Sequence, residues 1–296
     1  YQEEVRDPSR IPEVLNRVIM EAWRNSAPAQ MNIPRDMWTQ VIDVDLPQVV
    51  AFERPAGGEL AVAEAAKLLS EAKFPVILSG AGVVLSGAIP DLIQLAERLD
   101  APVCSNYQHN DSFPGSHPLA MGPLGYNGSK AGMEIIAKAD VVLALGTRLN
   151  PFSTLPGYGI DYWPKDAKII QVDINASRIG LTKKVTVGIQ GDAGKVARGI
   201  LAQLSETAGD AGRADRKHLI SQTKSRWAQE LTSLDHEDDD PGTEWNSGAR
   251  TRDAELMSPR QAWRAIMQAV PQEAIVSSDI GNNCAIGNAY PSFEEG

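Results

Sequence analysis

Cysteine is scarce in this chain: Cys104 and Cys284 are the only two, and they do not form a CxxC pair. This excludes a disulfide scaffold and a zinc ribbon and is typical of a reducing compartment, so we expect a cytoplasmic protein. No apolar run approaches the ~20 residues that cross a bilayer. Residues 1–30 also lack the basic-then-apolar pattern of a signal peptide. We therefore expect no membrane partner.

Basic residues are outnumbered, with 28 Lys and Arg against 38 Asp and Glu, which gives a net charge of −10. This balance disfavours nucleic acid as a partner. The four histidines show no metal-ligand spacing and no GxSxG motif occurs, which argues against zinc and serine hydrolases. The acidic run over 235–240 lacks the alternating oxygen ligands and turn of a cation loop, so we interpret it as a solvated loop.

From Gly58 onward, short apolar runs alternate with amphipathic stretches. The run Pro75–Ser79 is apolar on both faces, as in a parallel sheet covered on both sides, whereas Ile89–Leu99 repeats apolar residues at helical spacing. This alternation predicts an α/β fold with a doubly wound, Rossmann-like parallel sheet. The predicted elements are helices over 59–71, 89–99, 129–139 and 193–204 and strands over 75–79, 102–104, 140–145 and 168–173.

Outside this region the pattern is sparser. We expect a helix over 8–25 with Ser9 as its N-cap, and a strand over 29–33. Further helices are expected over 218–231 and from Ser258 to Ala269. A buried strand is expected over Ala274–Ser278.

Two glycine turns follow predicted strands of the sheet. Gly80 and Gly82 come after the first strand, but the third glycine is two positions too late for a dinucleotide-binding GxGxxG motif. Gly146 and Arg148 follow a later strand. These turns either bind a nucleotide or only allow tight bends at strand ends, as any doubly wound sheet requires.

Polar residues follow other strands of the same sheet. Asp173 and Asn175 are positioned either to bind ribose hydroxyls or to cap the next turn. His109 and Asp111 either face a ligand crevice or form a hydrogen-bonded loop. The residues alone leave these alternatives open.

The run Asp279–Tyr290 opens a turn after the strand predicted at 274–278. Such a turn directs backbone N–H groups beyond the end of the strand, where a diphosphate can approach. Gly281, Asn282 and Asn283 are the candidate contacts, because two adjacent amides suit a ligand as well as a structural turn. Without a paired base, Cys284 is interpreted as a packing residue. Since the sequence stops soon after this turn, we expect a chain cut inside a functional domain.

Several motifs together carry a family resemblance. The chain resembles the thiamin-diphosphate enzymes of the acetohydroxyacid synthase type over essentially its whole length, and its end is most similar to the sulfoacetaldehyde acetyltransferase subfamily. The motifs are Asn32–Asp36, Gly146–Arg148, Val172–Asn175, Met257–Arg260 and Val276–Phe293.

The resemblance implies three α/β domains. Here they are the end of a pyrimidine-binding domain (1–40), a linker (41–57), a complete central Rossmann-like domain (58–205), a second linker (206–256) and the start of a diphosphate-binding domain (257–296). The resemblance also places an activating glutamate upstream of Tyr1 and the Mg²⁺ ligands downstream of Gly296. No catalytic or metal-binding residue is therefore expected within 1–296, and the chain alone is expected to be inactive.

The resemblance also implies the chemistry of taurine and sulfonate degradation. Sulfoacetaldehyde and phosphate become acetyl phosphate and sulfite through a thiamin-diphosphate-bound acetyl intermediate. The cofactors are thiamin diphosphate and Mg²⁺, in a homodimer or homotetramer. Alternatives are a pyruvate-using enzyme, such as an acetolactate synthase, and a non-catalytic nucleotide-binding module.

The chain departs from the synthases at two places. Asn282 and Asn283 stand where the synthases have a Gln-His-Gln run, and Asn175 stands where they have a second aspartate beside a bound flavin. FAD is therefore not expected.

Overall fold

The structure of the chain is a computed structural model. It describes residues 1–46, 48, 52–125, 128–234, 259–271, 273–279 and 281–294. The acidic run at 235–240 and the residues that follow it, 241–258, lie outside the described residues.

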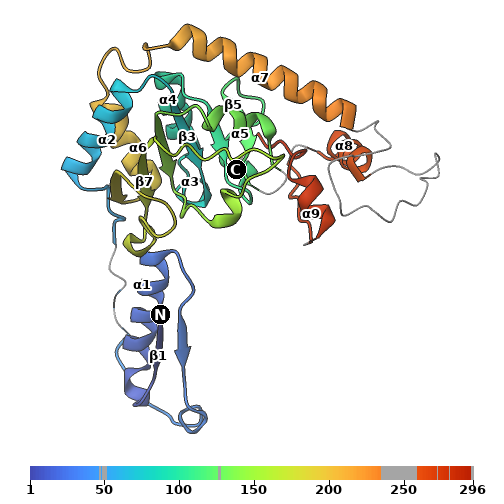
Figure 1. Ribbon diagram of the computed structural model, residues 1–296. Coiled ribbons are helices and arrows are strands. Elements are labelled where there is room, and N and C mark those ends of the chain that lie inside the picture. The colour runs from blue at the N-terminus through green and yellow to red at the C-terminus, as the bar shows by residue number, and fades with distance from the viewer. Residues whose placement is uncertain are drawn as a thin grey trace.

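A six-stranded sheet forms the centre of the molecule (Figure 1), and every neighbouring pair of its strands is parallel. Its strand order is β5-β4-β3-β6-β7-β8. The chain leaves β3 toward β4 on one side and later returns to β6 on the other, so the carboxyl ends of β3 and β6 form a topological switch point. The strands are β3 (Pro75–Ser79), β4 (Val103–Ser105), β5 (Ala120–Pro123), β6 (Val141–Leu145), β7 (Lys168–Asp173) and β8 (Val187–Gln190).

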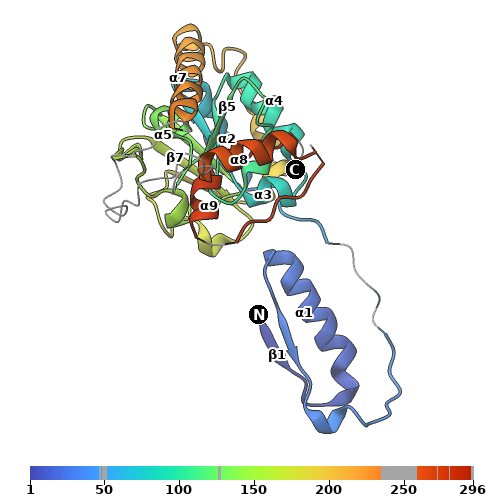
Figure 2. The same ribbon diagram turned by 90° about the vertical axis from the view of Figure 1, so that its right-hand side faces the viewer.

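Helices cover both faces of this sheet (Figures 1 and 2), as the near-continuous apolar strands predict. On one face α6 contacts both α2 and α4, and α5 contacts α7 on the other. The residues of β3 and β6 are buried throughout. The helices are α2 (Glu59–Glu71), α3 (Ala81–Leu85), α4 (Ile89–Leu99), α5 (Lys130–Ile136), α6 (Ala193–Gln203) and α7 (Arg213–Leu234).

The predicted α/β fold with a parallel sheet is therefore confirmed. The helices predicted at 59–71 and 89–99 and the strands predicted at 75–79 and 168–173 have the bounds of α2, α4, β3 and β7. The short elements α3, β5 and β8 were missed, because four or five residues carry too little periodicity for a prediction.

A smaller unit precedes the sheet and projects away from the main body in Figures 1 and 2. It consists of β1 (Gln2–Glu4), α1 (Ile11–Asn25) and β2 (Gln30–Asn32), with the two strands paired in parallel. Val5, Val14 and Val18 form its own hydrophobic cluster. We call residues 1–37 the N-terminal unit.

The start of the first helix differs from the prediction. A short 3-10 helix over Pro8–Arg10 precedes α1, and its N-cap is Asp7, whose side chain accepts a hydrogen bond from the backbone N–H of Ser9. The prediction of Ser9 as N-cap was wrong, because the carboxylate two residues earlier is also a strong capping acceptor.

The last part of the chain contributes α8 (Pro259–Ala269) and α9 (Asn282–Gly287), which contact each other. The strand predicted at Ala274–Ser278 does not form, and Ile275 is 97% exposed. A parallel strand needs a neighbour to receive its backbone hydrogen bonds, and none of the described strands pairs with this segment.

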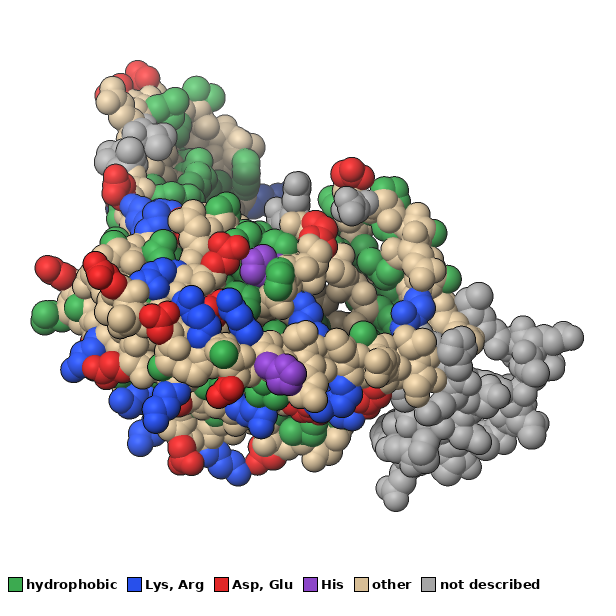
Figure 3. All heavy atoms as spheres, turned by 90° about the horizontal axis from the view of Figure 1, so that it is seen from above, with side chains coloured by type: hydrophobic (Ala, Val, Ile, Leu, Met, Phe, Trp, Pro, Cys, Tyr) green, Lys and Arg blue, Asp and Glu red, His purple; other side chains and the backbone are tan. Residues whose placement is uncertain are grey.

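The surface above the sheet mixes charges. On the face seen from above, acidic and basic side chains are interspersed (Figure 3). Among the described residues, no helix combines the length and the apolar character needed to cross a membrane.

Candidate functional site

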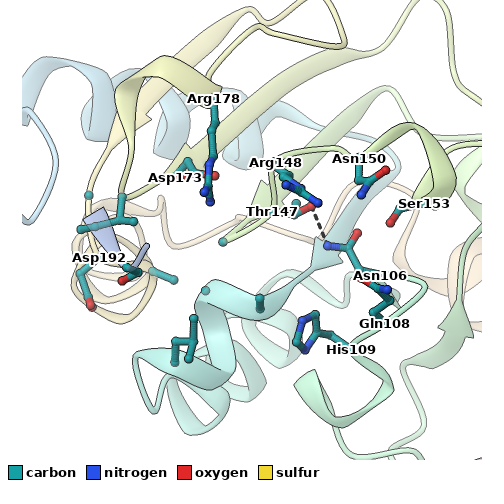
Figure 4. A pocket seen from close by; sticks show the side chains of 18 of the residues that line it. Asn106, Gln108, His109, Thr147, Arg148, Asn150, Ser153, Asp173, Arg178 and Asp192 are labelled. Atoms are coloured by element: carbon teal, nitrogen blue, oxygen red, sulfur yellow. Dashed lines mark hydrogen bonds between the residues drawn. The ribbon is translucent and has the colours of Figure 1, made fainter. Parts of the chain in front are cut away.

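A cavity of about 250 Å³ opens where the central strands end. Its walls come from the segments that follow β4, β3, β6, β7 and β8, so it lies at the topological switch point where open parallel sheets bind ligands. We call it the strand-end pocket. Figure 4 shows its side chains, which include Asn106, Gln108, His109, Thr147, Arg148, Asn150, Ser153, Asp173, Arg178 and Asp192.

Two glycines bring the turns after β3 and β6 into contact at the floor of this pocket. A Cβ atom added to Gly82 would lie 2.6 Å from the Cα atom of Gly146, closer than real side chains approach. Gly146 also has a φ of +64°, in the left-handed region that favours glycine. Glycine at both positions is therefore required for the two turns to meet.

Asn106 lies between the ends of β4 and β6 and is only 8% exposed. Its Nδ2 donates a hydrogen bond of 2.7 Å to Thr147 Oγ1, drawn as a dashed line in Figure 4. Its Oδ1 is buried and has no hydrogen-bond partner within the described part of the chain. Buried polar atoms rarely remain unpaired, so this oxygen is available to accept a hydrogen bond from a bound molecule.

The pocket carries charges of both signs. Arg54, Arg148 and Arg178 line it together with Asp173 and Asp192. Burial raises the pKa of Asp173, and this effect outweighs the hydrogen bond that its carboxylate accepts from the Asn175 N–H. In Figure 4, Arg178 extends from the side of Asp173 toward the middle of the cavity. Three guanidinium groups around one cavity suit an anion with several oxygens.

The turn at Gly281 lies in a different part of the molecule. Gly281 has a φ of +122°, and a Cβ atom added there would meet no atom within 4 Å. Gly281 precedes α9, and no side chain caps the first turn of that helix. The first-turn N–H groups of α9 therefore have no side-chain cap from Gly281, and uncapped N–H groups at the start of a helix can bind an anion. The side chains of Asn282 and Asn283 lie outside the described residues.

Two contacts link this turn to the sheet. The Tyr107 hydroxyl lies 2.7 Å from Cys284 Sγ, and Asn110 Nδ2 donates to the backbone oxygen of Asn288 at 3.3 Å. Tyr107 and Asn110 lie in the loop after β4, which also provides Asn106 to the strand-end pocket. The same loop therefore contacts both candidate sites.

Comparisons with known proteins point to one group of enzymes. The family model described as "Thiamine pyrophosphate enzyme, central domain" matches residues 62–200, which hold all six strands of the central sheet. The chain is 76% identical over 296 residues to a protein of Roseovarius nubinhibens named "Sulfoacetaldehyde acetyltransferase", and 69% identical over 296 residues to one of the same name from Rhodobacter capsulatus. Over residues 62–200 the chain is thus similar to the central domain of thiamine pyrophosphate enzymes.

The match covers the whole chain but only 49% and 50% of these two relatives, so the chain spans about half the length of the curated relatives that it matches. A crystal structure of benzoylformate decarboxylase from Polynucleobacter necessarius shares its fold, with a TM-score of 0.71 and 20% identity. That comparison covers 99% of this chain and 49% of the decarboxylase.

The structure brings together four of the six residues that the sequence offered as nucleotide-binding candidates in the central domain. Gly82, Gly146, Arg148 and Asp173 line the strand-end pocket. Gly80 is not part of the lining and packs against Asn106 and Thr147. Asn175 is also outside it and acts as an N-cap, accepting a hydrogen bond from the Ser177 N–H.

His109 also lines the pocket, in line with the interpretation that it faces a crevice. The residues that sequence reasoning missed are Arg54, Asn106 and Arg178. Arg178 lies five residues beyond the end of β7, where it resembles any surface arginine in sequence. Among the described residues, no cluster of His, Cys, Asp and Glu can hold a metal ion.

Proposed function

We propose that the protein containing this chain converts sulfoacetaldehyde and phosphate to acetyl phosphate and sulfite. The observation that carries this proposal is the 76% identity, over every residue of the chain, to a sulfoacetaldehyde acetyltransferase. Identity at this level preserves the core and almost every turn. In this reaction the carbon–sulfur bond breaks, sulfite leaves, and the two-carbon unit is transferred to a phosphate oxygen.

The proposal assigns a role to each part of the chain. Residues 1–40 belong to a pyrimidine-binding domain, 58–205 to the central domain and 257–296 to a diphosphate-binding domain, with linkers over 41–57 and 206–256. The separate hydrophobic cluster of the N-terminal unit supports the first boundary. The helix α7 lies in the second linker, yet Ile220 and Trp227 belong to the main core cluster, so this linker is anchored to the central domain.

The Gly281 turn is proposed to hold the diphosphate of the cofactor. The fit rests on the open space at Gly281 and on the uncapped first turn of α9. Backbone N–H groups of Asn282 and Asn283 would bind phosphate oxygens there, and Mg²⁺ would be held by residues outside the chain. When bound, thiamin diphosphate supplies a carbon nucleophile and an electron sink for the substrate's carbonyl carbon.

A substrate comparison tests the proposal and separates it from its nearest alternative. The full-length protein, assayed with thiamin diphosphate and Mg²⁺, is expected to release sulfite from sulfoacetaldehyde in a phosphate-dependent reaction. Consumption of pyruvate without sulfite release would instead identify a synthase or decarboxylase. Residues 1–296 alone are expected to release no sulfite.

A variant of the Gly281 turn tests the diphosphate assignment. Gly281→Ala places a side chain at a φ of +122°, which L-residues rarely adopt, and should raise the KM for thiamin diphosphate in the full-length enzyme. Gly180→Ala is the matched control, because Gly180 also has a positive φ and open space but lies far along the chain. An unchanged KM in the Gly281 variant would refute the assignment.

The strand-end pocket supports a second candidate function, the binding of a nucleotide. The specific observation is the buried, unpartnered Oδ1 of Asn106 beside three arginines and the Gly82–Gly146 contact. The cavity of about 250 Å³ lies below the ~300–1,000 Å³ of typical ligand pockets. This size favours a mononucleotide such as ADP over FAD, which we do not expect to bind.

Isothermal titration calorimetry with ADP, FAD, NAD and coenzyme A tests this second function. We expect ADP to bind and Asp173→Asn to change its affinity, because this carboxyl lies on the wall of the pocket. Absence of binding by all four ligands at millimolar concentration would leave the central domain with an architectural role.

We also propose a cytoplasmic homodimer or homotetramer. The low cysteine content supports the compartment. Light scattering of the full-length protein in solution would determine the number of subunits, and a monomer would refute the proposal.

A further inference from the structure

The N-terminal unit meets the central domain through a small group of side chains at the end of α1. Trp23 and Phe52 pack edge to face with their ring centroids 5.4 Å apart, and Arg54 lies over the Trp23 ring at 5.3 Å. Ser26, the left-handed C-cap of α1, and Asp192, the N-cap of α6, complete the group. We call these five residues the clasp.

Arg54 is the centre of the clasp. Its Nη2 donates to Ser26 Oγ at 3.3 Å, and its Nη1 lies 3.6 Å from Asp192 Oδ2. One contact thus reaches the N-terminal unit and the other reaches the central domain. Both contacts are longer than the 2.7–2.9 Å of a strong charge-assisted hydrogen bond. The guanidinium group therefore bridges the two parts without binding either of them tightly.

The third nitrogen of this guanidinium, Nε, makes no hydrogen bond within the clasp. Arg54 Nε is buried, and the described residues offer it no hydrogen-bond acceptor. Arg54, Ser26 and Asp192 all line the strand-end pocket. A buried donor on the wall of a cavity can be satisfied by a ligand in that cavity.

Three clasp residues, Ser26, Arg54 and Asp192, therefore form part of the pocket wall. An anion in the pocket would accept a hydrogen bond from Arg54 Nε and would also be attracted by the positive charges of Arg148 and Arg178, which line the same cavity. It would also fix the orientation of the guanidinium plane, and with it the donors that face Ser26 and Asp192. Ligand binding and the position of α1 are then coupled, and such coupling is reciprocal.

We propose that a ligand with phosphoryl oxygens in the strand-end pocket binds Arg54 and thereby holds the N-terminal unit against the central domain. This inference rests on the second candidate function, nucleotide binding, and adds a consequence to it. The N-terminal unit belongs to the proposed pyrimidine-binding domain, so the pocket would control the position of that domain relative to the centre of the enzyme.

Hydrogen–deuterium exchange tests the coupling in the full-length enzyme, with saturating thiamin diphosphate present throughout. The probes are ADP and inorganic pyrophosphate, and the readout is amide exchange over residues 20–32. We expect either probe to slow this exchange in the wild type. Arg54→Leu should abolish the effect and weaken binding about tenfold or more, the size expected for a charge-assisted hydrogen bond.

Two further variants make the test specific. Arg54→Lys keeps the charge but loses the forked donors, so we expect an intermediate effect. Arg24→Leu is the matched control, because Arg24 lies over the Phe52 ring at 4.9 Å but does not line the pocket. It should leave the response to both probes unchanged.

The outcomes separate the two proposals. ADP binding without slower exchange over 20–32, or slower exchange that persists in Arg54→Leu, would overturn the coupling and leave nucleotide binding intact. Slower exchange with pyrophosphate alone would support the coupling and refute nucleotide binding. No effect of either probe on the wild type would overturn the coupling.

Discussion

At the scale of single residues, Arg216 holds the most concentrated set of interactions in the described part of the chain. It is 1% exposed, and its guanidinium donates hydrogen bonds of 2.7–2.9 Å to five backbone carbonyls. Two of these carbonyls, at Leu99 and Asp100, end α4, where the helix dipole favours a cation. Arg216 thus joins α7 to the central domain.

Replacement of Arg216 should therefore be costly. Arg216→Met leaves five carbonyls without this donor, three of them in buried hydrogen bonds, and should lower the free energy of unfolding by about 3–5 kcal/mol. Lys217→Met is the control, because the Lys217 side chain is 57% exposed and lies 3.3 Å from Asp100, so its loss should cost less than about 1 kcal/mol. Chemical denaturation of the two variants measures the difference. Equal stabilities would contradict this account of Arg216.

A second residue-scale prediction concerns pH. Two hydrogen bonds of 2.8 Å from Arg17 lower the pKa of Glu3 to about 2. Because this folded pKa lies below the unfolded value of ~4.3, the charged carboxylate stabilises the N-terminal unit above pH ~4.3. That contribution is lost as the pH falls toward 2.

Titration of the Glu3 carboxyl by NMR checks this prediction. Arg17→Gln should raise the midpoint toward the ordinary glutamate value. Arg24→Gln, which removes a partner of Glu21 instead, should leave it unchanged. A Glu3 midpoint near 4.3 in the wild type would show that the pair does not form.

Residues such as Arg216, Arg54 and Asn106 could not be predicted from the sequence. Their partners are carbonyls, a hydroxyl and a cavity provided by distant segments, and no spacing rule connects them. Gly82, Gly146, Arg148 and Asp173 were predictable because they follow strands, and strand ends of one parallel sheet meet at one edge.

At the scale of elements, hydrophobic periodicity was sufficient to predict an element wherever that element buries a full face. The helix α4 places Leu92, Leu95, Ala96 and Leu99 on one buried stripe, and its predicted bounds are correct. The apolar run at Ala274–Ser278 has the same composition as a buried strand, yet it forms no strand and none of its residues is buried. A strand is defined by its partners, which composition does not show.

The close contact between the turns after β3 and β6 predicts that a side chain at Gly146 destabilises the protein. Gly146→Ala combines a φ of +64° with a Cβ atom 2.7 Å from Gly82 Cα. Gly159→Ala has a similar φ of +71° but meets no atom within 4 Å, so it isolates the backbone cost of ~1–2 kcal/mol.

We expect Gly146→Ala to destabilise the protein by roughly 1–3 kcal/mol more than Gly159→Ala, the usual cost of overpacking. Thermal unfolding of the two variants measures this difference. If both variants unfold at the same temperature, the two turns do not require the close approach that shapes the strand-end pocket.

At the scale of the whole molecule, the described part of the chain combines two hydrophobic clusters with two parallel sheets, of two and six strands, and a final turn beside the larger sheet. The fold class and the resemblance to thiamine pyrophosphate enzymes follow from the sequence, because they rest on alternating apolar runs and several short motifs. The position of the N-terminal unit against the sheet could not be predicted from the sequence, because it depends on the contacts of the clasp. The chain covers about half of its curated relatives, so the proposed activity belongs to the longer protein.

The products of that longer protein provide the most direct measurement. The full-length enzyme, incubated with sulfoacetaldehyde, phosphate, thiamin diphosphate and Mg²⁺, should form acetyl phosphate and sulfite in equal amounts, with acetyl phosphate followed by ³¹P NMR. Omission of phosphate should abolish acetyl phosphate formation. Absence of sulfite, or sulfite without acetyl phosphate in the complete mixture, would contradict the proposed function.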